Sequence, residues 1–230
     1  MYLALILYGS HARGDNRMKS DVDILAITAK GLIDKNKPKR GVSLHEYPLD
    51  FLKKQAEAGN LFLSHIVHEG VPLSDPLSLH KQLKRSFEFK TNYDAEKKEA
   101  AAILWYCKEF ATEANQEKLR KRIIWSIRTI IISDAAEKKI PIFSSRALEN
   151  YSKIDDLKTT IDSRNTIQLE KLFLSARLVL RLYTRSIRPS NRASTLIIDK
   201  WMRGKGKMAG QTPYYLGLVD GDFEEQPFYT

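Results

Sequence analysis

The chain lacks several features that would place it in other classes of protein. It has 230 residues and a single cysteine, Cys107, so no disulfide forms within it and nothing points to an oxidising compartment. No apolar run approaches the roughly 20 residues that a membrane-spanning helix needs, so we expect a cytoplasmic protein with no membrane contact. Internal repeats and low-complexity tracts are absent too, which leaves one compact domain or two small ones.

Acidic residues are fewer than basic ones. Lys and Arg number 38 and Asp and Glu 28, which gives a net charge of +10 and a sequence pI near 9.5. Such a surplus suits an anionic partner such as a nucleotide, a nucleic acid or a lipid surface, with general solubility as the plainer explanation. It argues against an enzyme that modifies cationic antibiotics, because that substrate favours an acidic pocket.

The first 90 residues combine strand and helix signals. Short apolar runs bounded by turn residues predict strands over residues 3–8, 20–27 and 41–47. Helices are then predicted over residues 49–58 and 61–69, because Gly59 and Gly70 follow them as C-caps. This part of the sequence predicts a small mixed sheet with helices.

Beyond about residue 94 the sequence predicts long helices. Apolar residues recur at helical spacing over residues 101–114, 119–136, 167–183 and 193–202. We therefore expect an α+β protein with a mixed-sheet domain over residues 1–90 and an all-α helical bundle over residues 91–204. Residues 205–230 are expected to form a flexible basic loop, Gly204-Lys205-Gly206-Lys207, and an acidic tail that contains tyrosine.

One motif in the first part carries chemistry. Gly9-Ser10 follows the first apolar strand, and Asp21-Val22-Asp23 opens the second after ten intervening residues. Glycine lets the backbone approach a phosphate, and the Ser10 hydroxyl and nearby amides can hold a triphosphate. Two aspartates two apart on a strand direct both carboxylates to one face, which suits magnesium, with manganese as the alternative ion.

Two arginines lie between the halves of this motif. Arg13 and Arg17 are candidates for contacts with phosphate oxygens. Taken separately, Gly9-Ser10 could be an ordinary turn, and Asp21 with Asp23 could be exposed acids on an edge strand. Their combination at this spacing favours a nucleotide-binding and metal-binding site.

The motif resembles that of a known family. Tyr8-Gly9-Ser10-His11-Ala12-Arg13-Gly14-Asp15 and Ser20-Asp21-Val22-Asp23-Ile24-Leu25 are similar to the signature of minimal nucleotidyltransferases of the DNA polymerase β superfamily, in the two-domain bacterial form of anti-phage or toxin–antitoxin systems. The resemblance covers about residues 3–76. It implies a small mixed sheet with helices on one face, magnesium and a nucleoside triphosphate donor.

Members of that family often carry a third carboxylate on a later strand, where it polarises the acceptor hydroxyl. Glu46 is the candidate in this chain. Strand alternation predicts that Val42 and Leu44 pack on the helices, that Ser43, His45 and Tyr47 face the metals, and that Glu46 faces away unless a bulge turns it inward.

The helical part contributes an arginine stripe. Arg177, Arg181 and Arg185 are four residues apart, and Arg188 follows, so a helix would align them on one face. No acidic residue lies between Glu170 and Asp199 to neutralise them. The stripe is either a solvated face or, as we expect, a site for a triphosphate or a nucleic-acid acceptor.

The sequence leaves the acceptor open. It predicts transfer of a nucleoside monophosphate to a hydroxyl of a protein or a growing oligonucleotide, in bacterial anti-phage defence. An antitoxin-type enzyme that places AMP on a partner tyrosine, and a non-catalytic nucleotide- or nucleic-acid-binding module, are the alternatives. Tyr229 in the tail is a candidate acceptor, although an unstructured tail without a function is the simpler explanation of its tyrosines.

Overall fold

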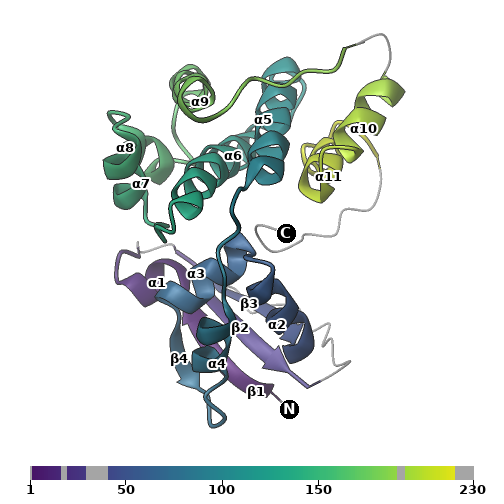
Figure 1. Cartoon of the computed structure of the whole chain (residues 1–230). Helices are drawn as coiled ribbons and strands as arrows, with labels where there is room; N and C mark the ends of the chain where they lie inside the picture. Colours follow the sequence, from purple (N-terminus) through teal and green to yellow (C-terminus); the bar gives the residue numbers. More distant parts are fainter. Residues whose placement is uncertain (1, 17–19, 30–40, 191–194, 221–230) are drawn as a thin grey trace. The chain divides into compact units, whose positions relative to one another are not determined.

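A computed structural model describes residues 2–16, 20–29, 41–190 and 195–220. The described residues divide into two compact units, one up to residue 90 and one over residues 91–220, and each is described by itself (Figure 1). Within the described residues no helix is both long enough and apolar enough to cross a membrane.

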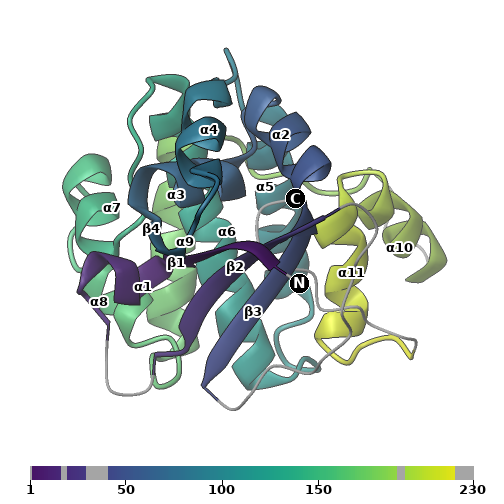
Figure 2. The same ribbon diagram turned by 90° about the horizontal axis from the view of Figure 1, so that it is seen from below.

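The first unit is built on a four-stranded mixed sheet (Figure 2). Its strands are β1 Tyr2–Tyr8, β2 Val22–Thr28, β3 Val42–Pro48 and β4 Val71–Ser74, in the order β3-β2-β1-β4. Strand β1 runs antiparallel to both β2 and β4, whereas β2 and β3 are parallel. The α+β fold predicted from the sequence is confirmed, with the sheet in the first unit and helices after it.

Three helices cover one face of this sheet: α2 Leu49–Glu57, α3 Leu61–Glu69 and α4 Leu79–Ser86. The sheet contributes fully buried side chains such as Ile6, Leu25 and Ile27, and the helices contribute Leu52, Ile66 and Leu83. Helix α3 begins where the Asn60 side chain accepts hydrogen bonds from the backbone N–H groups of Phe62 and Leu63.

The helices lie on the opposite face of β3 from the one predicted. Tyr47 packs on the core cluster, and the rings of His45 and Tyr47 lie 6.4 and 6.0 Å from that of Phe62 on α3. The expectation that Val42 and Leu44 pack on the helices is therefore wrong. Period-two alternation separates the two faces of a strand, but the half-buried residues of β3 do not identify from the sequence which face the helices cover.

Strand β4 and helix α4 were not predicted. Every residue of β4 is exposed, and a run of four residues that contains a proline is too short to predict a strand. The strand forms because its backbone pairs with β1, with Pro72 opposite Ile6. Helix α4 then begins where the Asp75 carboxylate accepts hydrogen bonds from the N–H groups of Leu79 and His80.

The second unit is helical. Its elements are α5 Asp94–Glu109, α6 Gln116–Glu137, α7 Ser145–Ser152, α8 Leu157–Asp162, α9 Leu169–Tyr183, α10 Thr195–Arg203 and α11 Lys207–Tyr215. Helices α5 and α6 carry most of the core, including Ile103, Ile127 and Ile131, each fully buried. The buried Lys97 on α5 is 2.8 Å from Glu137 on α6, which ties the two helices together.

Residues 207–215 form helix α11 instead of the expected flexible loop. The buried Glu99 carboxylate accepts a hydrogen bond of 2.9 Å from the Ala209 N–H in the first turn of α11. Gly206 has φ of +152°, and a Cβ there would lie 2.1 Å from Glu99 Oε1. A glycine that suggests a loop in the sequence is therefore the residue that lets a distant carboxylate cap this helix.

Candidate active site

Gly9 brings the two halves of the sequence motif together. It begins helix α1, Gly9–Arg13, directly after β1, with φ of +75°. A Cβ at this position would lie 2.5 Å from Asp23 Oδ2, closer than any side chain tolerates. Glycine is needed here both for the left-handed backbone and for the close approach of the Asp23 carboxylate.

The two aspartates lie at the start of β2. Tyr8 pairs with Asp23 across β1 and β2, which places the carboxylate at the point where β1 passes into α1. Asp23 is half-buried, and Asp21, one residue before the strand, is exposed. The backbone N–H of Val22 between them donates to the Gly41 carbonyl, which holds this segment against the residue that precedes β3.

These residues fit a divalent cation as a two-carboxylate set. Carboxylate oxygens are the ligands that magnesium prefers, and Asp21 lies directly before β2, two residues from Asp23. Among the described residues no group of three or more His, Cys, Asp or Glu side chains could hold a metal ion. Oxygens of a bound triphosphate and water would complete such a coordination shell.

Tyr8, the last residue of β1, packs its ring against α3, with ring centroids 5.6 Å from those of Phe62 and His65. Its side chain is 2% exposed, and its hydroxyl has no hydrogen-bond partner among the described residues. Burial, followed by the charge of Asp23 and by Tyr47, raises the pKa of Tyr8 well above its usual value. Tyr8 therefore stays protonated, so its hydroxyl adds no further negative charge beside the carboxylate pair.

Arg13 is held by protein carboxylates. Its Nη1 lies 2.6 Å from Glu69 Oε2, and its Nε lies 3.2 Å from Asp15 Oδ1. His65 completes this cluster at 2.8 Å from the same Glu69 oxygen. These contacts fasten α1 to α3, so the predicted phosphate contact of Arg13 competes with two carboxylates that already bind it.

Glu46 lies away from the two aspartates. It pairs with Ala26 in β2, and alternation places Ala26 on the opposite face of the sheet from Asp23. The Tyr2 hydroxyl donates a hydrogen bond to its carboxylate. Glu46 is thus on the face that simple alternation predicts, and no bulge turns it toward Asp23.

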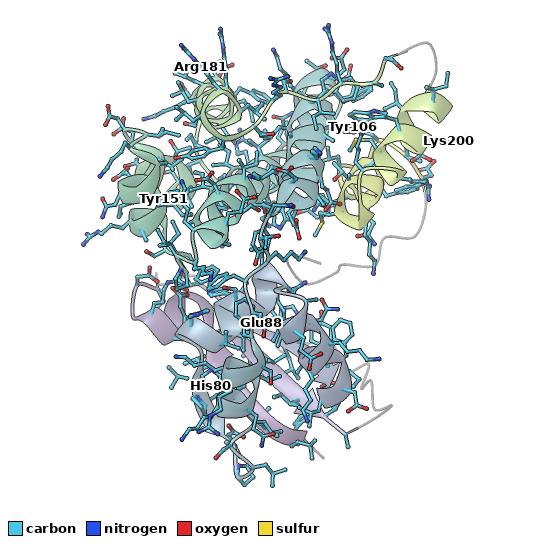
Figure 3. All side chains as sticks on the ribbon, viewed as in Figure 1. His80, Glu88, Tyr106, Tyr151, Arg181 and Lys200 are labelled. Carbon is cyan, nitrogen blue, oxygen red and sulfur yellow. The ribbon has the colours of Figure 1, made fainter. Side chains whose placement is uncertain are left out.

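Two of the predicted arginines lie on α9. Arg177 and Arg181 are exposed and form no ion pair within the described ranges, and Figure 3 shows Arg181 on the side of α9 that points away from α6. Arg185 is not part of the helix, because α9 ends at Tyr183 and Thr184 is extended. A proline four residues past Arg185 opposes helix in this segment. Arg17 and Tyr229 lie outside the described residues.

Comparison with known families identifies the class of protein. Residues 3–134 match the model of the nucleotidyltransferase domain, and the chain belongs to this family. The match contains Gly9, Ser10, Asp21 and Asp23, and it extends through α5 and most of α6. No curated protein matches the chain.

The family defines the general reaction. The chain is a nucleotidyltransferase, a transferase that takes a nucleoside triphosphate and moves a nucleoside monophosphate to an acceptor. The resemblance that the sequence motif predicts, to minimal nucleotidyltransferases of the DNA polymerase β superfamily, is confirmed at the level of this family.

Proposed function

We propose that this nucleotidyltransferase uses magnesium to transfer a nucleoside monophosphate from an NTP or dNTP to a hydroxyl of a protein or a growing oligonucleotide, in bacterial anti-phage defence. The observation that carries the reaction is the approach of Gly9 to Asp23, which brings a strand-to-helix turn against one of the two aspartates. A phosphate held at this turn lies beside the carboxylates.

Each residue has a role in this proposal. Gly9 leaves room for a phosphate beside Asp23, and the Ser10 hydroxyl donates a hydrogen bond to a phosphate oxygen. Asp21 and Asp23 hold the divalent cation. When bound, that cation lowers the pKa of the attacking hydroxyl and stabilises the charge of the leaving pyrophosphate.

The surface of α9 supports a macromolecular acceptor. Arg177 and Arg181 are exposed cations without ion pairs in the described part of the chain, and they suit a phosphate backbone or acidic side chains. Three leucines one turn apart, Leu174, Leu178 and Leu182, are 58%, 38% and 58% exposed on the same helix. An exposed apolar row beside arginines favours a protein partner, as in antitoxin-type AMPylation of a partner tyrosine.

The experiment that tests the reaction measures pyrophosphate release and transfer of label from each labelled NTP and dNTP, with magnesium or manganese. Asp21→Ala combined with Asp23→Ala should abolish both signals. The matched control is Glu57→Ala with Glu88→Ala, which removes two exposed carboxylates of the same unit (Glu88 is labelled in Figure 3) and should leave both unchanged.

The form of the product identifies the acceptor. A ladder of products indicates oligonucleotide synthesis, and label on a purified partner that disappears after Tyr→Phe substitution in that partner indicates AMPylation. Activity that survives the double aspartate variant would contradict the assigned metal site.

A further inference from the structure

Strand β3 places two polar side chains on the face of Asp23. In the parallel pairing of β2 with β3, Ser43 lies opposite Asp23 and His45 lies opposite Leu25. Paired residues share a face of the sheet, so Ser43 and His45 are on the side of the Asp23 carboxylate. Neighbouring strands are about 4.8 Å apart, which makes Ser43 a direct neighbour of Asp23.

These two side chains are bonded to each other. Ser43 Oγ lies 3.0 Å from His45 Nε2, and both side chains are half-buried. When the ring carries its hydrogen on Nδ1, the serine hydroxyl donates to Nε2, which is the arrangement that activates a hydroxyl as a nucleophile.

The surroundings keep His45 neutral. Burial lowers the pKa of His45 to about 4. The rings of Tyr8 and Phe62 lie 6.1 and 6.4 Å away, and Tyr8 is itself uncharged at neutral pH. At neutral pH the imidazole is therefore uncharged, and its Nε2 can accept the hydrogen bond of the Ser43 hydroxyl.

The β3 residue that pairs with Asp23 is a serine, so no carboxylate lies at this position. Glu46 is on the other face, and no third metal-binding side chain joins Asp21 and Asp23 in the described ranges. What occupies this position is a hydroxyl that belongs to the protein. An acceptor hydroxyl must lie next to the metal-binding carboxylates, and Ser43 meets this requirement without an added substrate.

We propose that Ser43 is a site of self-nucleotidylation, in which the chain accepts a nucleoside monophosphate from its own bound NTP. Ser43 Oγ forms a bond to the α-phosphorus, the bond from that phosphorus to the bridging oxygen of the β-phosphate breaks, and pyrophosphate leaves. The serine proton passes to His45 Nε2. The inference rests on the proposed function and names an acceptor for it within the chain.

The test incubates the full chain with each NTP or dNTP and magnesium, followed by intact mass and mapping of tryptic peptides. The peptide Gly41–Lys53 contains Ser43 as its only serine, and fragment ions separate it from Tyr47. We expect one nucleoside monophosphate on this peptide of the wild-type chain. Ser43→Ala should lose the adduct, Ser43→Thr should retain it at a lower rate, and Ser86→Ala, which alters another half-buried serine of this unit, should keep it.

Two further variants separate chemistry from binding. His45→Asn should slow adduct formation by about 100-fold, because an amide does not take the proton. Ser43→Ala should bind nucleotide with calcium, where transfer is suppressed, within about 2-fold of wild type, so that its loss of adduct is not a loss of binding or of fold.

The outcomes distinguish this inference from the reaction itself. Pyrophosphate release or product on an external acceptor, with no adduct on Ser43, would overturn the inference and leave the nucleotidyltransferase function in place. An adduct on Tyr47 or Tyr229, or one that persists in Ser43→Ala, would overturn it as well. Absence of adduct, product and pyrophosphate release with every nucleotide and acceptor would overturn the proposed function together with it.

Discussion

Both units place a glycine of positive φ against a carboxylate, and they use the arrangement differently. In the first unit a Cβ at Gly9 would meet Asp23 at 2.5 Å, and in the second a Cβ at Gly206 would meet Glu99 at 2.1 Å. Glu99 is buried and accepts hydrogen bonds from the backbone N–H groups of Ala209 and Met208. Its carboxylate is occupied in capping α11.

The carboxylates of the first unit lie where a ligand can reach them. Asp23 is half-buried at a strand end, beside the exposed Asp21. Burial raises the pKa of Glu99, whereas the hydrogen bonds from α11 oppose that rise. The difference teaches that a close glycine–carboxylate contact does not by itself indicate a catalytic site. The exposed second carboxylate and the strand-to-helix turn are what distinguish the first unit.

Gly9→Ala should produce the largest effect. The new Cβ would displace Asp23, and misplacement of a catalytic group by about 1 Å costs on the order of 100-fold in rate. Pyrophosphate release measures it. Gly14→Ala is the matched control, because Gly14 also has positive φ, +73°, with nothing within 4 Å of its Cβ position. That variant should lose about 1 kcal/mol of stability and keep its activity. Equal losses of activity in Gly9→Ala and Gly14→Ala would mean that backbone strain, and not the displacement of Asp23, lowers the rate.

Gly206→Ala tests the second glycine. Its Cβ would push Glu99 away from the first turn of α11, and we expect a loss of about 2 kcal/mol in the free energy of unfolding. Gly204→Ala is the control, because its Cβ would make only ordinary contacts at 3.5 and 3.6 Å. Urea denaturation measures both. An unchanged stability in Gly206→Ala would show that α11 does not depend on the Glu99 cap.

Glu69 should make the stability of the first unit depend on pH. Burial acts to raise its pKa, but the hydrogen bonds and charges of His65 and Arg13 outweigh this and lower it below the usual 4.5. The pKa of Glu69 is therefore lower in the folded chain than in the unfolded chain. The stability that the Glu69 charge contributes is complete above the unfolded-state pKa and is lost as the pH falls through the folded-state pKa.

Glu69→Gln should therefore lower the free energy of unfolding by about 2 kcal/mol at neutral pH. The difference in stability between this variant and the wild type should shrink as the pH falls below the unfolded-state pKa of Glu69. Denaturant unfolding at a series of pH values between about 3 and 7 measures both effects. Glu57→Gln is the control and should track the wild type, because Glu57 is exposed and forms no ion pair within the described residues. A cost that is the same at every pH would contradict the assigned role of the Glu69 charge.

The arginines of α9 should give the smallest effect. Arg177→Ala with Arg181→Ala should leave stability within about 0.5 kcal/mol, because both side chains are exposed. If they bind a phosphate backbone, affinity for a labelled single-stranded oligonucleotide should fall, and its salt slope should decrease by about 1 for each arginine that binds a phosphate. Lys121→Ala is the control, since Lys121 is paired with Glu117 at 2.7 Å. Anisotropy measures binding, and an unchanged salt slope would limit α9 to a protein partner.

The sequence predicted most elements of the first unit but not β4 and α4, and in the second unit it did not predict α7, α8 and α11. The strands β1, β2 and β3 and the helices α2 and α3 lie within a few residues of their predicted bounds, because short apolar runs end at glycine, serine or proline there. Helix α5 begins seven residues before its predicted start at residue 101. The segment Asp94–Lys98 is polar, and it is Lys97, through Glu137 on α6, that fixes it.

For the site, spacing predicted which residues belong together but not how they meet. The motif placed Gly9 and Asp23 in one site, and alternation put Ser43 and His45 on its face. The sequence did not reveal that Arg13 binds Glu69 or that Ser43 and His45 form a hydrogen bond. Both contacts depend on side-chain rotamers, which are set by packing in the folded chain.

The amino-acid sequence by itself determined the class of reaction and the α+β architecture, since a spaced motif and hydrophobic periodicity are local properties of the chain. Only the tertiary structure decided which face of β3 the helices cover and that the glycines after α10 lead into a helix. These outcomes depend on partners far apart in the sequence, such as Phe62 for β3 and Glu99 for α11. No local pattern specifies them, because each is settled by burial and hydrogen bonding between distant segments.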